Sequence, residues 1–144
     1  RTGEQRLRAN CNDWYDRDDV IKQFDQKYQN RSKEMRARAR DNYVSRGITD
    51  FSEQKKGLNY ADYLLKQNRV TTTEEADKLA IATLQYREEL ISYGNYDIIF
   101  DDAKKDRFIE KQIDKYKGTD KEDKARETFR EFIKNVKEFD KVNN

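Results

Sequence analysis

The stretch TTEEADKLAIATLQYREELISYG, residues 72–94, carries the clearest indication of the fold class. It begins with Thr72 and Glu75 at the spacing of a helix capping box, and it ends with Gly94, which is typical of the position just after a helix. Its apolar residues cover more than half of the helical circumference, as expected of a helix that packs on several sides. They are Ala76, Leu79, Ala80, Ile81, Leu84, Leu90 and Ile91. The sequence therefore predicts a central helix here.

The second strong helical pattern lies near the C-terminal end of the chain. Thr119 and Glu122 have capping-box spacing after Gly118, so we expect a helix to begin there. The apolar residues that follow recur at alternating intervals of four and three, which is heptad spacing. They are Ala125, Phe129, Phe132, Val136 and Phe139. We expect them to form bundle core rather than a coiled-coil surface for another chain.

The longest pattern occupies the N-terminal half, from Trp14 to Arg46. With Asp13 as N-cap and Gly47 as stop, a continuous helix would have about 32 residues and a length of roughly 50 Å. Its apolar residues fall on one stripe of the helix. They are Trp14, Ile21, Phe24, Tyr28, Met35, Ala39 and Tyr43. The sequence thus predicts a long first helix.

Three weaker segments join these patterns. Residues 48–56 have the composition of a polar connection, with Phe51 as an anchor. A cap formed by Asn59 and Asp62 predicts a short helix that ends at residue 68 and buries one apolar side. That side consists of Tyr60, Leu64 and Leu65. Residues 98–117 favour a further helix, although the run Ile98, Ile99 and Phe100 could instead form a brief extended piece.

Composition indicates a folded protein with a small core. Charged residues make up 42% of the chain and hydrophobic residues 34%, and the mean hydropathy is −1.31. Nine Tyr, seven Phe and one Trp argue against disorder, since aromatic residues are scarce in segments that do not fold. The absence of proline favours long helices. We expect an all-α antiparallel helical bundle of four to five helices, with residues 1–12 as an N-terminal extension and residues 13–144 as a single helical domain.

The residues present give little support to catalytic or metal chemistry. The chain has no histidine, so a nucleophilic triad lacks its base and a di-iron bundle lacks ligands. Cys11 is the single cysteine, which excludes an intramolecular disulfide and a Cys-based zinc site. Acidic residues cluster near Asp13 and Asp97 without EF-hand spacing, and no glycine-rich phosphate loop occurs. We expect no catalytic residue, metal or cofactor; a glycosidase-type carboxylate pair is the catalytic alternative that composition leaves open.

Basic residues are concentrated between Arg31 and Arg46. They are Arg31, Lys33, Arg36, Arg38, Arg40 and Arg46, against Glu34 and Asp41. On a helix they would flank both sides of the apolar stripe. Three interpretations stay open: a solvated rim, a phosphate-binding face for nucleic acid, and a docking face for an acidic protein. The small net charge of +2 favours the solvated rim.

These patterns predict a non-catalytic helical accessory or assembly subunit of a larger multiprotein complex, with other protein subunits as partners. Its expected docking side chains are Trp14, Tyr15, Phe24, Tyr28, Arg31, Arg36, Arg38, Arg40 and Tyr43. The aromatic residues between Tyr93 and Phe100 have the same character. The alternative is a nucleic-acid or ribonucleoprotein accessory factor that uses the basic Arg31–Arg46 face. Self-association through the long helix is also compatible with the pattern.

Apolar runs are too short to cross a membrane. The longest, Leu79 to Ala82, is far below the roughly 20 residues that a spanning helix needs. We expect no transmembrane span, and any association with a membrane complex would be peripheral. The chain begins with Arg1 rather than Met, which fits removal of a targeting segment or trimming. Removal would place the protein in an organelle or a secreted compartment; otherwise we expect the cytoplasm.

Overall fold

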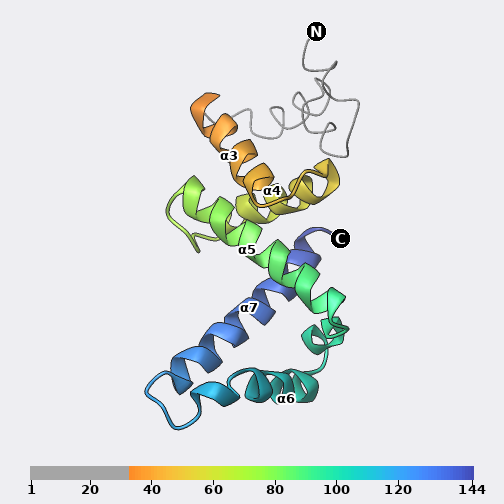
Figure 1. Cartoon of the computed structure of the whole chain (residues 1–144). Helices are drawn as coiled ribbons and strands as arrows, with labels where there is room; N and C mark the ends of the chain where they lie inside the picture. The colour runs from red at the N-terminus through yellow and green to blue at the C-terminus, as the bar shows by residue number, and fades with distance from the viewer. Residues whose placement is uncertain (1–32) are drawn as a thin grey trace. The chain divides into compact units, whose positions relative to one another are not determined.

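The computed structural model describes residues 33–144, with side chains from residue 37 onward, and this part of the chain is all-α (Figure 1). Its five α-helices are α3 (Lys33–Ser45), α4 (Phe51–Lys66), α5 (Thr73–Ser92), α6 (Asp102–Gln112) and α7 (Glu122–Val142), and two 3-10 helices are η3 (Tyr96–Ile99) and η4 (Asp114–Tyr116). The prediction of an all-α fold with four to five helices is confirmed. The predictions for residues 1–32, including the extension and most of the long first helix, lie outside the described residues.

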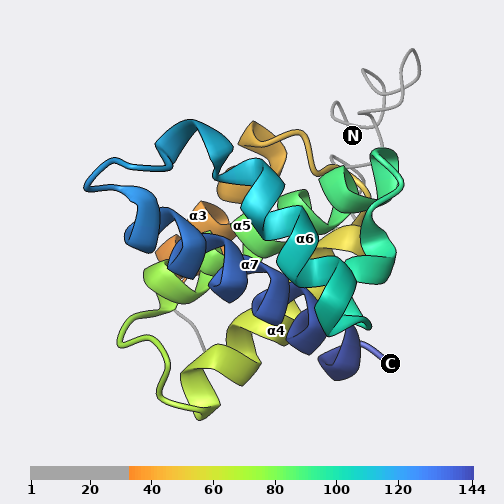
Figure 2. The same ribbon diagram turned by 90° about the horizontal axis from the view of Figure 1, so that it is seen from below.

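The described part of the chain divides into two compact units, unit 1 up to Ile81 and unit 2 from Ala82 to Asn144, and the boundary falls inside α5. In its described part, unit 1 contains α3, α4 and the first half of α5. Unit 2 contains the second half of α5, the two 3-10 helices, α6 and α7. Within unit 2, η3 packs against both α6 and α7, and these two helices also contact each other (Figure 2).

Helix α3 ends where the sequence predicts. Gly47 has a φ of +81°, the left-handed conformation that glycine adopts at low cost just after a helix. The N–H of Gly47 donates to the carbonyl of Val44 at 2.9 Å, and the N–H of Ile48 donates to the carbonyl of Tyr43 at 2.9 Å. These bonds satisfy carbonyls that the helix end would otherwise leave without a donor.

The predicted polar connection at residues 48–56 is wrong, because α4 already begins at Phe51. Asp50 is its N-cap: the carboxylate accepts from the N–H of Ser52 at 2.9 Å. Gln54 is completely buried, and its amide donates to the carbonyl of Ile48 at 2.9 Å. A polar residue therefore occupies a core position, which hides the amphipathic pattern of the first turns.

Helix α5 confirms the prediction made for residues 72–94. The hydroxyl of Thr72 accepts from the N–H of Glu75 at 3.1 Å, as in a capping box, and Gly94 has a φ of +73°. Most of the predicted apolar face is buried, namely Ala76, Ala80, Ile81, Leu84 and Leu90. Ile91 differs, since its side chain is exposed.

The segment 98–117 is not one helix, and its alternative as an extended piece is also wrong. Ile98 and Ile99 are buried in the 3-10 turn η3. Asp101 then leaves the helical conformation, with φ −135° and ψ 107°, and its carboxylate accepts from the N–H groups of Ala103 and Lys104. A strong N-cap inside the segment thus starts a new helix, α6.

Helix α7 is confirmed, but the details of its start differ from a capping box. The helix begins at Glu122, whose carboxylate accepts from the N–H of Gly118 at 3.0 Å. The Thr119 hydroxyl instead donates to the carbonyl of Tyr116 and accepts from the N–H of Lys121. In the heptad, Val136 and Phe139 are buried, Ala125, Phe129 and Phe132 are half-buried, and Ile133, which the heptad omits, is buried as well.

Each unit has its own hydrophobic cluster. In unit 1, Ala39, Tyr43, Leu58 and Ile81 pack together, with Ile48 against them. In unit 2 the cluster is aliphatic, and half-buried aromatic rings pack around it. Its buried members are Leu90, Ile98, Ile99, Ile109, Ile113, Ile133 and Val136. Three of these rings, Tyr86, Phe108 and Phe129, also line the cavity described next.

Candidate functional site

The predicted docking residues are only partly covered by the structure. Trp14, Tyr15, Phe24, Tyr28 and Arg31 lie outside the described residues, and the side chain of Arg36 on α3 is not described.

The other three docking residues lie on α3. Arg38 is exposed and pairs with Glu74 over 3.8 Å, whereas Arg40 is half-buried. Tyr43 is 0% exposed and belongs to the core of unit 1, so its side chain is not presented at the surface. A hollow beside Arg38 has a volume of only about 20 Å³, too small for a ligand.

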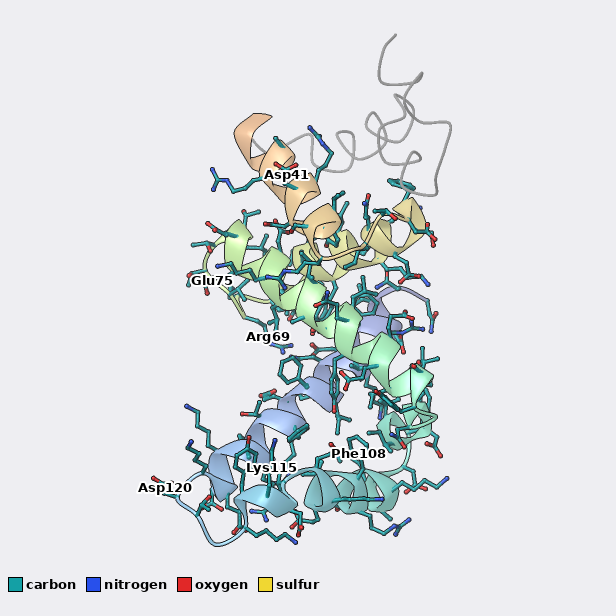
Figure 3. The ribbon with its side chains drawn as sticks, viewed as in Figure 1. Asp41, Arg69, Glu75, Phe108, Lys115 and Asp120 are labelled. Carbon is teal, nitrogen blue, oxygen red and sulfur yellow. The ribbon has the colours of Figure 1, made fainter. Side chains whose placement is uncertain are left out.

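Unit 2 contains a much larger hollow, an open cavity of about 580 Å³ that we call the aromatic cavity. Its walls come from three helices and the turn before η3. They consist of Tyr86, Glu89 and Leu90 from α5, Tyr93 and Asn95 from the turn between α5 and η3, Phe108 and Gln112 from α6, and Phe129 from α7. Figure 3 shows Phe108 on the side of α6 that faces α5. The volume lies within the range of small-molecule sites.

Helical spacing explains how the sequence lines this cavity. On α5, Glu89 and Leu90 follow Tyr86 by three and four residues, so these side chains share one face. Tyr93 follows Tyr86 by seven residues, just after the helix, and its N–H still donates to the carbonyl of Glu89 at 3.0 Å, so it continues this face. On α6, Phe108 and Gln112 are four residues apart and likewise lie above one another. The sequence alone does not reveal this site, because each helix supplies only part of the wall.

The Tyr86 side chain forms the most enclosed polar part of the wall. Its hydroxyl oxygen is buried and has no hydrogen-bond partner among the described residues. Its ring lies 5.4 Å from the ring of Phe132, measured between centroids. Burial, and to a smaller extent the negative charge of Glu89, raises the pKa of Tyr86 to about 12. The hydroxyl therefore stays neutral at physiological pH and can still donate or accept a hydrogen bond.

The charge in the cavity wall is negative. Glu89 is the only charged residue among the described residues that line it, and no Lys or Arg belongs to the wall. Glu89 and Tyr93 are exposed at the mouth, whereas Phe108 and Phe129 are half-buried. The site thus combines four aromatic rings, one carboxylate and two neutral amides.

Two ion-pair clusters hold the helices around the cavity. The Arg87 guanidinium of α5 pairs with Asp140 of α7 at 2.6 Å, and the Tyr96 hydroxyl donates to the same carboxylate. Burial and this hydrogen bond to Asp140 raise the pKa of Tyr96. The Arg87 guanidinium also lies 5.5 Å from the centroid of the Tyr96 ring. This cluster links α5, η3 and α7.

The second cluster links α6 to α7. Arg126 donates to both carboxylate oxygens of Glu110, at 2.8 and 3.0 Å, and to Glu122 at 2.9 Å. Its hydrogen bonds with Glu110 lower the pKa of that carboxyl. Bidentate pairing fixes the orientation of Arg126 relative to Glu110 as well as their distance. It therefore holds α6 and α7, which carry part of the cavity wall, in a defined arrangement.

The described residues contain no group of three or more side chains suited to hold a metal ion. Nor is any helix in this part of the chain long and apolar enough to cross a membrane. Comparisons with protein families, with curated proteins and with solved structures find no match for this chain.

Proposed function

We propose that this chain is a non-catalytic helical accessory subunit that binds another protein of a larger complex. The observation that carries the proposal is the clustering of exposed apolar side chains. In the described part of the chain the exposed large hydrophobic residues are Ile91 at 44%, Tyr93 at 73% and Phe100 at 69%, and all lie within ten residues. Exposed large apolar side chains, aromatic ones above all, are typical of protein interfaces.

The chemistry of the chain also favours binding over catalysis. Without histidine, a general base would have to be a carboxylate, a lysine or a tyrosine with a suitable pKa. In the aromatic cavity, Glu89 is exposed at the mouth and Tyr86 has its pKa raised away from neutrality, so neither is arranged as a base for a neutral-pH reaction. Aromatic walls and preorganised helices suit recognition instead.

The test is an affinity purification of the tagged chain from its native extract, at low and high salt, with and without nuclease. A fixed set of proteins that survives salt and nuclease would support an accessory subunit, because apolar interfaces persist when charges are screened. Loss of all partners on nuclease treatment would contradict it and favour the basic Arg31–Arg46 segment as a nucleic-acid contact.

Variants connect that result to the exposed surface. We expect a double replacement, Ile91→Ala with Phe100→Ala, to reduce recovery of the partner proteins at least tenfold without loss of helicity. Lys124→Ala, an exposed replacement on α7, is the control and should leave recovery unchanged. Unchanged recovery with the double variant would place the interface elsewhere, such as on the docking residues predicted between Trp14 and Arg31.

A further inference from the structure

We infer that the aromatic cavity binds an alkylammonium group, that is, a positively charged nitrogen that carries methyl or longer alkyl substituents. Such groups occur on free choline-like molecules and on methylated lysine side chains. This inference concerns the cavity alone and does not depend on the protein partner proposed above.

Aromatic lining is the first argument. Tyr86, Tyr93, Phe108 and Phe129 bring four rings to one cavity from three helices and the turn after α5. The faces of aromatic rings carry negative electrostatic potential, and clusters of rings around a pocket are the usual receptors for alkylated ammonium ions. Leu90 adds an apolar contact for the alkyl substituents.

Charge is the second argument. Glu89 places a carboxylate at the mouth, and the wall contains no basic side chain among the described residues. An anionic ligand would meet this carboxylate without a compensating cation, so phosphates and carboxylates are disfavoured. A cation would be attracted by both the carboxylate and the rings.

The difference in hydration between alkylated and bare ammonium groups explains why the aromatic cavity should prefer the alkylated group. A bare ammonium is compact and strongly hydrated, so its transfer into a ring-lined cavity costs more. Alkyl groups spread the charge and supply apolar surface that the rings can cover. The cavity of about 580 Å³ has room for the head group together with a short chain.

The experiment compares two ligands of the same shape. The full chain is titrated with choline and with 3,3-dimethylbutan-1-ol, in which carbon replaces the charged nitrogen, and amide chemical shifts are followed by NMR. We expect choline to bind roughly tenfold more tightly, with shifts at Tyr86, Glu89 and Phe108. Equal affinities would mean a purely apolar cavity and would overturn the inference. So would the absence of binding by both ligands.

Two variants locate the binding. Glu89→Gln should weaken choline about fivefold and leave the neutral alcohol unchanged, because it removes only charge. Glu131→Gln, an exposed carboxylate on α7 outside the cavity wall, is the matched control. Tyr93→Ala removes a ring that is mostly exposed, so the fold should persist while choline binding weakens. Full choline affinity in both cavity variants would overturn the assignment.

A second arm identifies the source of the group. Peptides with trimethyllysine and with unmodified lysine are titrated beside choline. Tighter binding of the trimethylated peptide than of choline would identify a protein ligand, whereas the reverse order would identify a free small molecule. Preference for unmodified lysine over both would contradict the inference. Failure here would leave the affinity purification unaffected, so the two proposals can fail separately.

Discussion

At Gly57 of α4 the backbone lies so close to the Tyr43 ring that there is no room for a Cβ atom. A Cβ at this position would lie 2.7 Å from Cε1 and 2.9 Å from Cζ of Tyr43, with the hydroxyl oxygen nearer still. Gly57→Ala should therefore lower the free energy of unfolding by about 1–2 kcal/mol, since overpacking outweighs the roughly 1 kcal/mol that alanine gains over glycine in a helix. Urea unfolding measures the change.

The same pair offers its own control. In the background Tyr43→Leu, the ring that Cβ would meet is absent, so the added replacement Gly57→Ala should be neutral or stabilising. If alanine at position 57 destabilises both backgrounds equally, the close approach of Tyr43 to α4 is not the cause.

Tyr86 predicts a stability change at alkaline pH. Its pKa is about 12 in the folded chain, against an ordinary value of 10.0. Between these values an unfolded tyrosine loses its proton while folded Tyr86 keeps it, so the folded state binds more protons and the unfolding free energy falls as pH rises. Tyr86→Phe should remove this part of the fall, as measured by urea midpoints from pH 9.5 to 11.5.

Tyr93→Phe is the matched control for that series, because Tyr93 also lines the cavity, just after the end of α5, but is exposed. We expect this control to keep the alkaline fall of the parent chain. Equal slopes for the parent and Tyr86→Phe would contradict the assignment of the effect to the cavity hydroxyl.

Among the helices, α6 depends on one residue for its start. The Asp101 carboxylate accepts from the N–H of Ala103 at 3.0 Å and from the N–H of Lys104 at 3.2 Å. Asp101→Ala should lower the free energy of unfolding by about 1 kcal/mol, the usual cost of losing an N-cap. Thermal or urea unfolding checks this value, and Asp106→Ala, at an exposed interior position of α6, should cost much less.

Local signals explain which helix ends the sequence predicts. Gly47, Gly94 and Gly118 all have positive φ, and each follows a helix or turn where the sequence places a stop. Asp50 and Asp101 are equally local caps, but the turns that follow them are mostly polar, so hydrophobic periodicity did not indicate where α4 and α6 begin. Periodicity predicted the helices with continuous apolar faces, and it misplaced the starts of helices whose first turns are polar.

The aromatic cavity could not be predicted in the same way. Two of its rings have helical spacing at the end of α5, yet Phe108 and Phe129 are 21 residues apart in sequence and reach the cavity only through tertiary packing. The ion pairs of Arg87 with Asp140 and of Arg126 with Glu110 also join distant segments. Helical spacing fixes which residues share a face, whereas the meeting of faces requires the three-dimensional structure.

The composition of the whole chain determines how its charge depends on pH. It has 31 basic and 29 acidic residues and no histidine. Histidine is the side chain that ordinarily titrates between pH 5 and 8, so the charge of the folded chain should change little over that interval. Below pH 5, the change of charge comes mainly from protonation of the acidic residues.

The stability of the whole chain should therefore be nearly constant from about pH 5.5 to 7.5 and fall at lower pH. The hydrogen bonds from Arg126 lower the pKa of Glu110, and the N–H of Gly118 followed by Arg126 lowers that of Glu122. Lys104 similarly lowers the pKa of Asp97. A carboxyl with a depressed pKa stabilises the folded state above its ordinary pKa, and this contribution is lost as pH falls through the folded value.

Urea midpoints from pH 2.5 to 7.5 test this profile. Glu110→Gln together with Glu122→Gln should flatten the acid limb, because the variant has fewer carboxylates that must be protonated on unfolding. High salt should flatten it too, since all three carboxylates are solvent-accessible and screening weakens their attraction to the bases. A steep change between pH 5.5 and 7.5 would contradict the argument, because it would require a group with a strongly shifted pKa in a chain that has no histidine.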